Sequence, residues 1–371
     1  MVKILDGDID RIGKYLRDEK KTLYIWGMGV MLHICARQCL ADYDLESRIK
    51  CCTDVDKNKV NKFTKILSKK ILIIEKNDFL KQFQEDQTGV LIIACSYFSE
   101  IFDMIDGMKE LNNKECIILP ITFLRMKESA SFLSVSGSNK IPKIIHYCWF
   151  GGNELDAQSK KCIESWKKMC PDYQIIEWNE ENYDIQSSPW VQFAYEHKNW
   201  AYVSDYVRAD VLYKYGGLYF DTDVEMIRNM DELLKFSAFA GFEKWPVVNT
   251  GGGCGSEPGF WLWKEVMKLK NNFVLQQNDF ILPLSSGYFD TYPLIQRGLK
   301  TNGELQDIDG CMVLPSEYFH PLDYIRKQIY KTQNTFSIHY FGWSWANKEM
   351  VNGNRESVKY YNQICKRLQK I

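Results

Sequence analysis

Ser204-Asp-Tyr-Val-Arg-Ala-Asp-Val-Leu-Tyr-Lys-Tyr-Gly-Gly-Leu-Tyr-Phe-Asp-Thr-Asp-Val-Glu225 is the stretch from which the rest of the chain can be understood. Its serine is a good helix N-cap, because the hydroxyl can accept a hydrogen bond from a backbone N–H one turn later. Apolar residues then recur at helical spacing up to a Gly-Gly pair, where glycine can end the helix in a left-handed conformation. A short buried strand is expected at 218–220, and it leads into Asp-Thr-Asp at 221–223.

Asp221 and Asp223 are expected to point the same way, because side chains alternate along an extended chain. Two carboxylates aimed at one point repel each other unless a cation lies between them. A hard divalent cation that also binds phosphate oxygens is the natural candidate, and a solvated Asp-x-Asp turn is the alternative. In the preceding helix, Asp205 and Arg208 are three residues apart and therefore share one face.

The order of these features resembles a known family. Ser-Asp-x-x-Arg, followed by Leu-Tyr-x-x-Gly-Gly-x-Tyr-x-Asp-x-Asp, is similar to the sugar-binding region of glycosyltransferases that contain a DXD motif. These enzymes, glycosyltransferase family 32, include relatives of the yeast initiation mannosyltransferases and of bacterial capsular polysaccharide transferases. The glucosylating domains of large clostridial toxins are more distantly similar. The resemblance covers residues 140–350 and implies a metal-dependent fold of the GT-A type.

The resemblance also implies roles for the motif residues. Asp221 and Asp223 would bind Mn²⁺ or Mg²⁺, which would bridge the phosphates of a UDP- or GDP-hexose donor and neutralise the departing diphosphate. Arg208 would stabilise that charge or contact the donor sugar, and Asp205 would hydrogen-bond donor hydroxyls. We therefore expect these four residues to form the catalytic group.

A predicted strand near the end of the chain, Phe336-Ser-Ile-His339, ends in histidine and precedes an aromatic loop with Ser344 and Trp345. This order resembles the family's His-x-x-x-x-Ser-Trp segment, and in related folds a late histidine supplies the third protein ligand of the metal. A lone histidine is more often a hydrogen-bonded core residue, but beside two carboxylates the ligand role is favoured. The expected metal ligands are Asp221, Asp223 and His339.

Further donor contacts are expected from two other segments. The predicted strand that starts at Ile141 resembles the family's first catalytic strand; it contains His146, expected in the core, and leads to Trp149. Trp149 would stack on the nucleotide base or, alternatively, cap the core. Asn249 begins a glycine-rich loop that would let the backbone approach a sugar, or would serve as a flexible connector. The expected donor-binding set is Trp149, Asp205, Arg208, Asp221, Asn249, Ser344 and Trp345.

The first third of the chain predicts a Rossmann-like domain, with a helix at 9–19. Apolar, β-branched runs predict strands at 23–26, 48–53, 71–74, 90–94 and 116–119. Strands that alternate with helix-like stretches are typical of a parallel sheet with helices on both faces. Gly27-x-Gly29 and the later Asp54 suggest dinucleotide binding, but the third glycine of that fingerprint is absent because position 32 is leucine. A structural or docking role is the favoured interpretation.

Chain length and composition set the organisation. The 371 residues suffice for two α/β domains, and the polar segment 134–139 divides them into a Rossmann-like domain, 1–136, and a GT-A domain, 139–371. With 47 basic and 48 acidic residues, no overall field favours nucleic acid. No run has the length of a membrane span or the form of a signal peptide, so a cytoplasmic protein is predicted. The basic tail, 360–371, is expected to be a solvated helix, and weak contact with the inner face of the membrane is the minority interpretation.

Together these features predict a metal-dependent retaining glycosyltransferase. It would move a hexose from a UDP- or GDP-sugar to a hydroxyl of a glycan or a lipid-linked saccharide, in bacterial surface polysaccharide synthesis. Retention is implied by the resemblance, and a same-face substitution is favoured because no carboxylate of the motifs is clearly placed as a nucleophile. Two alternatives stay open: an NAD(P)-linked sugar-nucleotide-modifying enzyme, and a non-enzymatic carbohydrate-binding protein.

Overall fold

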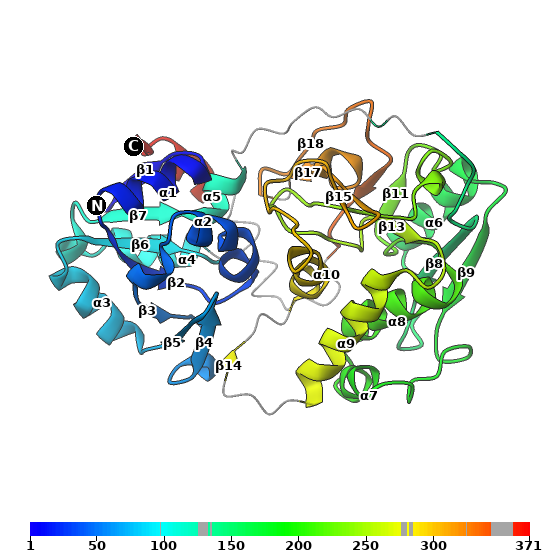
Figure 1. The fold of residues 1–371 in the computed structure, drawn as a ribbon, viewed down its shortest axis with the longest axis horizontal. Helices are drawn as coiled ribbons and strands as arrows, with labels where there is room; N and C mark the ends of the chain where they lie inside the picture. The colour runs from blue at the N-terminus through cyan, green and yellow to red at the C-terminus, as the bar shows by residue number, and fades with distance from the viewer. Residues whose placement is uncertain are drawn as a thin grey trace. The chain divides into compact units, whose positions relative to one another are not determined.

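A computed structural model shows how the chain is organised (Figure 1). The described residues are 1–96, 98–124, 133, 136–275, 280–281, 285–323, 325–342 and 359–371. They fall into two compact units, the first drawn from 1–127, 278–288 and 347–371, and the second from 128–277 and 289–346. This differs from the expected division, which placed everything after residue 139 in one domain.

The first unit is built on a six-stranded sheet in the order β20-β1-β7-β6-β2-β3, and every neighbouring pair is parallel. The expected parallel sheet is thus confirmed. Its strands are β1 (Lys3–Asp6), β2 (Thr22–Trp26), β3 (Ile49–Thr53), β6 (Gly89–Ile93), β7 (Glu115–Ile118) and β20 (Gln369–Lys370). Its helices are α1 (Ile9–Asp18), a π-helical turn (Met31–Cys35), α2 (Arg37–Asp42), α3 (Lys76–Glu85), α4 (Phe98–Asp106) and α5 (Leu119–Leu124).

Neighbouring residues of β2 show that both faces of this sheet are covered. Tyr24 packs against Phe79 and Phe83 of α3. Ile25 lines a small apolar cavity on the other face with side chains of α1 and α2. Side chains alternate along a strand, so helices on both faces are needed to bury such a continuous apolar run.

Two expectations for the first unit are corrected by the structure. The first part of the run 71–74 is not in the parallel sheet, because β5 (Lys69–Leu72) forms an antiparallel hairpin with β4 (Phe63–Ile66), to which β14 (Phe280–Ile281) adds in parallel. The run reaches the parallel sheet at Ile73, which forms an isolated parallel bridge with Cys52 of β3. The basic tail does not end as a solvated helix, because β20 pairs with β1. Arg367 of this tail forms a two-pronged ion pair with Asp106, with N–O distances of 2.7 and 2.8 Å.

The second unit contains a mixed seven-stranded sheet in the order β15-β16-β12-β13-β10-β8-β9. The strands are β8 (Ile144–Cys148), β9 (Gln174–Trp178), β10 (Gly217–Tyr219), β12 (Ala238–Gly241), β13 (Cys254–Ser256), β15 (Gln306–Ile308) and β16 (Cys311–Leu314). Two small antiparallel pairs lie outside it: β11 (Val224–Met226) with β19 (Ser337–His339), and β17 (Leu322–Asp323) with β18 (Gln328–Ile329). The helices are α6 (Ala157–Met169), α7 (Pro189–Glu196), α8 (Trp200–Tyr215), α9 (Trp261–Leu275) and α10 (Ser286–Ile295).

An aromatic core holds the small β11–β19 pair against the sheet. Trp166 of α6 is fully buried, and its indole N–H donates to the Val224 carbonyl of β11 at 2.8 Å. Phe220 and Phe336 belong to the same core. The turn that contains the Asp-x-Asp motif is therefore attached at both ends to packed strands. No helix in the described part of the chain is both long and apolar enough to cross a bilayer.

Candidate active site

Helix α8 carries Asp205 and Arg208, and it begins one turn earlier than its sequence suggested. Asn199 is the N-cap and accepts from the Tyr202 N–H, whereas Ser204 lies inside the helix. The apolar face extends back to the buried Val203, so an earlier asparagine can cap a longer helix. The helix ends as expected, with Gly216 at φ 64°.

Arg208 is buried among three carboxylates, of which Asp205 and Asp290 are 13% and 1% exposed and Asp221 is 36% exposed. Its side chain is 3% exposed, and its Nη2 lies 2.7 Å from Asp205 Oδ1 and 3.7 Å from Asp290 Oδ2. Its Nη1 lies 3.7 Å from Asp221 Oδ1. Burial disfavours the guanidinium charge, but the charges of these carboxylates outweigh it, so the pKa of Arg208 lies well above its usual value. Asp205 and Arg208 share one face of the helix, as expected, and their side chains form an ion pair there.

Asp221 and Asp223 lie in a turn between β10 and β11, not in an extended strand. The Val224 N–H donates to the Asp221 carbonyl at 3.1 Å. The alternation argument for these two side chains was therefore wrong. A turn brings them together instead, because it folds residues two apart toward a common side.

The pairing of β11 with β19 brings His339 to this turn. In the antiparallel register Val224 lies opposite His339, and the Tyr340 N–H donates to the Asp223 carbonyl at 3.1 Å. His339 Nε2 lies 3.3 Å from Asp223 Oδ1. Asp221, Asp223 and His339 each offer one ligand atom within 4.8 Å of the others. The structure brings together the expected metal ligands, and their role stays a prediction.

The two carboxylates of the motif have opposite pKa shifts. Burial raises the pKa of Asp221 above its ordinary value, although Arg208 works against this effect. Burial also disfavours ionised Asp223, but His339 and the Gly342 N–H, which donates to Oδ2 at 2.6 Å, bring its pKa below the ordinary value. The Asp223 carboxylate in turn raises the pKa of His339 against the effect of burial. The positive charges near Asp221 are therefore too weak to offset the effect of burial on its carboxylate.

The donor atoms fit a divalent metal. Two carboxylates and one imidazole provide hard oxygen ligands with one nitrogen, a set that suits Mn²⁺ better than Zn²⁺. The Nδ1 atom of His339 is buried and has no hydrogen-bond partner among the described residues. This unpartnered nitrogen leaves His339 with hydrogen-bonding capacity that the protein alone does not satisfy.

The glycine-rich loop packs against Asp221 rather than serving as a free connector. A Cβ at Gly251 would lie 2.1 Å from Asp221 Oδ2, so no other residue fits there without displacing that carboxylate. The Gly251 carbonyl accepts from the Asp221 N–H at 2.8 Å. Asn249 Oδ1 accepts from the Gly251 N–H at 2.9 Å, so this side chain orients the loop. Contact of Asn249 with a sugar stays a prediction.

Asp290 and Lys270 are parts of the site that the sequence analysis missed as functional residues. Asp290 is 1% exposed and accepts from the Thr250 hydroxyl at 2.6 Å. Lys270 is fully buried, 3.7 Å from Asp205 Oδ2, with Nζ 4.6 Å from the Trp190 ring centroid. A signal existed for Lys270, because it follows Leu262 and Val266 at four-residue spacing on the buried face of α9. No comparable pattern marks Asp290.

Three further residues were predicted to bind the nucleotide-sugar donor: Trp149, Ser344 and Trp345. Trp149 is half-buried against the core, and its indole N–H donates to the Asn153 carbonyl at 2.6 Å. Base stacking by Trp149 stays a prediction. Ser344 and Trp345 lie outside the described residues. The core role expected for His146 is confirmed, since it is fully buried and bonds Trp178 and the Gly216 carbonyl through its two nitrogens.

In the first unit, the carboxylate of Asp54 already has partners within the protein, so it is not left available to accept from a ribose hydroxyl. Its Oδ2 accepts from the Met28 N–H at 2.8 Å and lies 3.0 Å from Lys59 Nζ. A Cβ at Gly27 would lie 2.7 Å from the Ala94 carbonyl, and the φ of Gly27 is 109°, so close packing and backbone conformation both require glycine here. The structural interpretation of this motif accounts for these contacts.

Glu243 offers a pH-dependent test of the site's electrostatics. Burial raises its pKa from 4.5 to about 7. The folded state therefore disfavours ionised Glu243, and its contribution to stability is lost as the pH rises from the unfolded pKa to the folded one. In chelator, Glu243→Gln should raise Tm relative to wild type at pH 8 and change it little at pH 4. Glu181→Gln, at an exposed position, is the control, and equal shifts for both variants would contradict this account.

Comparison with known proteins identifies the class to which this site is similar. Residues 156–240 match the family described as "Glycosyltransferase sugar-binding region containing DXD motif". This segment includes Asp205, Arg208, Asp221 and Asp223. The resemblance indicated by the order of motifs is therefore confirmed for this part of the chain.

Individual relatives are mannosyltransferases. Inositol phosphoceramide mannosyltransferase 3 of Schizosaccharomyces pombe is 36% identical over 112 residues, which are 28% of this chain and 30% of that protein. Inositol phosphoceramide mannosyltransferase 2 of the same yeast is 27% identical over 228 residues, 59% of this chain and 62% of that protein. The chain thus spans less than two thirds of these two relatives. The solved structure of PaToxG Glycosyltransferase is 17% identical with a TM-score of 0.35, covering 42% of this chain and 68% of that one.

Proposed function

We propose that the second unit is a GT-A type glycosyltransferase that moves a hexose from a nucleotide-diphosphate sugar to a hydroxyl acceptor, with retention of configuration. One observation carries this proposal. The buried Arg208 is paired with Asp205, Asp290 and Asp221, and Asp221 also belongs to the cluster with Asp223 and His339. Arg208, Asp205, Asp221 and Asp223 lie within the segment that matches the sugar-binding family. A carbohydrate-binding protein without catalysis has no need for so costly a buried charge cluster.

The residues of this chain would act as a prepared electrostatic environment. A divalent metal, Mn²⁺ or Mg²⁺, would be held by Asp221, Asp223 and His339 and would supply charge neutralisation for the leaving diphosphate. Arg208 provides a positive charge that is oriented before the donor arrives, because Asp205 and Asp290 hold its guanidinium. Asp205 Oδ2 lies 3.7 Å from Lys270, so both oxygens of Asp205 lie near cations. We propose that Asp205 accepts from hydroxyls of the donor sugar.

The acceptor is proposed from the relatives. The two mannosyltransferases are named for inositol phosphoceramide, a lipid. We therefore favour mannose as the sugar, GDP-mannose as the first donor to test, and a lipid-linked acceptor over a free glycan. The bacterial polysaccharide setting expected from the resemblance gains no support from these names.

A donor-hydrolysis assay tests the proposal. The full-length chain, with Mn²⁺ and then with chelator, is incubated with GDP-mannose and with UDP-hexoses. We expect release of one nucleoside diphosphate that depends on the metal. When an acceptor is present, NMR of the glycosylated acceptor should show the transferred sugar in the α configuration. Release that does not depend on the metal, or no release from any donor, would exclude this function. An inverted anomeric configuration would exclude only the retaining mechanism.

A further inference from the structure

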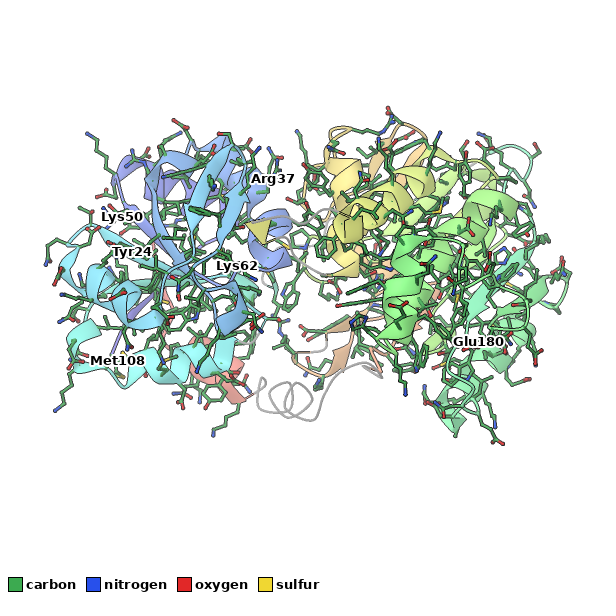
Figure 2. All side chains as sticks on the ribbon, turned by 90° about the horizontal axis from the view of Figure 1, so that it is seen from below. Tyr24, Arg37, Lys50, Lys62, Met108 and Glu180 are labelled. Carbon is green, nitrogen blue, oxygen red and sulfur yellow. The ribbon has the colours of Figure 1, made fainter. Side chains whose placement is uncertain are left out.

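The exposed hairpin β4–β5 of the first unit has no part in the proposed sugar transfer. Between Asp56 and Glu75 the chain has six lysines and no acidic residue, whereas its net charge as a whole is −1. Figure 2 shows the described side chains of this unit and labels Lys50 and Lys62. A local basic surface on a protein without an overall positive charge indicates an anionic partner.

The inner face of this hairpin is fixed to the unit. Thr64, Ile66 and Ile71 are 0%, 2% and 5% exposed. Thr64 Oγ1 lies 2.9 Å from His33 Nε2, within hydrogen-bond distance. The hairpin is therefore a packed part of the first unit, and its outer side chains are presented from a fixed backbone.

The outer face combines positive and apolar side chains in a regular arrangement. Lys65 lies opposite Lys70 across the two strands, and Phe63 lies opposite Leu72. Both lysines are exposed, Leu72 is 40% exposed, and Lys70 Nζ lies 3.9 Å from the Phe63 ring centroid. Like charges directly opposite each other destabilise a sheet. The two strands therefore hold two positive charges close together on this face.

Residues next to the hairpin in the chain add further exposed side chains. Val55 is 51% exposed, and Lys57 and Lys62 are exposed. Lys59 differs, because it pairs with Asp54 inside the unit. No ion pair of Lys57, Lys62 or Lys65 is present within the described ranges of the chain. The charges of these three lysines are thus not neutralised by carboxylates of the described residues.

We propose that the outer face of the β4–β5 hairpin binds the surface of a bilayer that contains anionic lipids. Lysines would lie at the headgroups, while Leu72 and Val55 would enter the apolar boundary beneath them. Nucleic acid fits less well, since the aromatic ring of Phe63 on this face is half-buried and covered by Lys70. The choice of a membrane rests on the proposed function, because a lipid-linked acceptor would be presented at such a surface.

Vesicle sedimentation with the full-length chain tests this proposal. We expect binding to vesicles of phosphatidylcholine mixed with phosphatidylglycerol, weaker binding to phosphatidylcholine alone, and release by high salt. Each lysine removed from an anionic surface weakens binding about fivefold, equivalent to ~1 kcal/mol. The variant Lys62→Glu/Lys65→Glu should therefore bind at least about 25-fold more weakly. Its Tm should stay close to that of wild type, because both positions are exposed.

The matched control is Lys160→Glu/Lys161→Glu, which makes the same charge change on exposed positions of α6 in the other unit. It should retain vesicle binding close to wild type. Equal loss in both variants, or no binding of wild type to the anionic vesicles at low salt, would overturn the proposal. Loss of binding to a random-sequence oligonucleotide, with unchanged vesicle binding, would assign the face to nucleic acid instead. The vesicles contain neither donor nor saccharide acceptor, so these outcomes are separate from those of the hydrolysis assay.

Discussion

Asp223→Asn will lower the transfer rate by about two orders of magnitude or more and will remove most of the Mn²⁺-induced rise in Tm. The ligand atoms of Asp221, Asp223 and His339 lie within 4.8 Å of one another. The substitution therefore removes one of the two negative charges that would bind the metal. It should also lower Tm in chelator, because the pKa of Asp223 lies below its ordinary value and its ionised form stabilises the folded protein. Rates and melting curves, with and without Mn²⁺, measure all three effects.

Asp221→Asn provides the contrasting case. Burial raises the pKa of Asp221, so its ionised form destabilises the folded protein above the unfolded value of 3.8. In chelator this variant should therefore keep or raise Tm, while it too loses the Mn²⁺ response. Asp172→Asn, at a carboxylate that is 57% exposed, is the control and should leave the metal response unchanged. If the Mn²⁺-induced shift is the same in all of these variants, the metal does not bind at this turn.

The same site predicts the direction of a pH effect. The pKa of His339 is raised above 6.5 by Asp223, and a protonated imidazole cannot bind a metal. Mn²⁺ must then displace a proton, so the Mn²⁺-induced stabilisation should weaken as the pH falls through the raised pKa. Mn²⁺ binding that is equally strong from pH 8 to pH 5 would be inconsistent with His339 as a ligand.

Arg208→Met will destabilise the protein by about 3–5 kcal/mol, because it leaves buried carboxylates without their positive partner. Asp205 and Asp290 are 13% and 1% exposed, so water cannot replace the guanidinium around them. Arg208→Lys keeps the charge and should remain folded, yet it should lose about two orders of magnitude in rate, since an ammonium cannot keep the planar guanidinium contacts. Urea unfolding and donor turnover measure the two effects separately.

Arg297→Met is the matched control for this prediction. Arg297 also pairs with an aspartate, at 2.7 Å from Asp309, but its side chain is 39% exposed. Ion pairs in water contribute about 0–1 kcal/mol, so this variant should unfold close to wild type. A similar loss of stability in both methionine variants, or wild-type turnover in Arg208→Lys, would reduce Arg208 to an ordinary helix charge.

Local sequence patterns were enough for the strands β2, β3, β6 and β7 of the parallel sheet and for the helix that carries Asp205 and Arg208, apart from its first turn. Both depend on short-range periodicity: apolar runs with turn residues between them, and a Gly-Gly pair that ends a helix. The motif order was also sufficient to identify the sugar-binding region, because the family match covers residues 156–240. The structure retains these features because residues close together in the sequence determine them.

Contacts between segments that are far apart in the sequence were decided only by the tertiary structure. His339 meets Asp223 because β19 pairs with β11 in one register, and the chain end joins the first unit because β20 pairs with β1. Asp290 reaches Arg208 from a helix that no local pattern linked to the site. Strand pairing over such separations is governed by burial of side chains from both partners, and this burial is not encoded in either segment alone. The amino-acid sequence by itself determined the motifs and their class, whereas the packed fold decided which charges face each other.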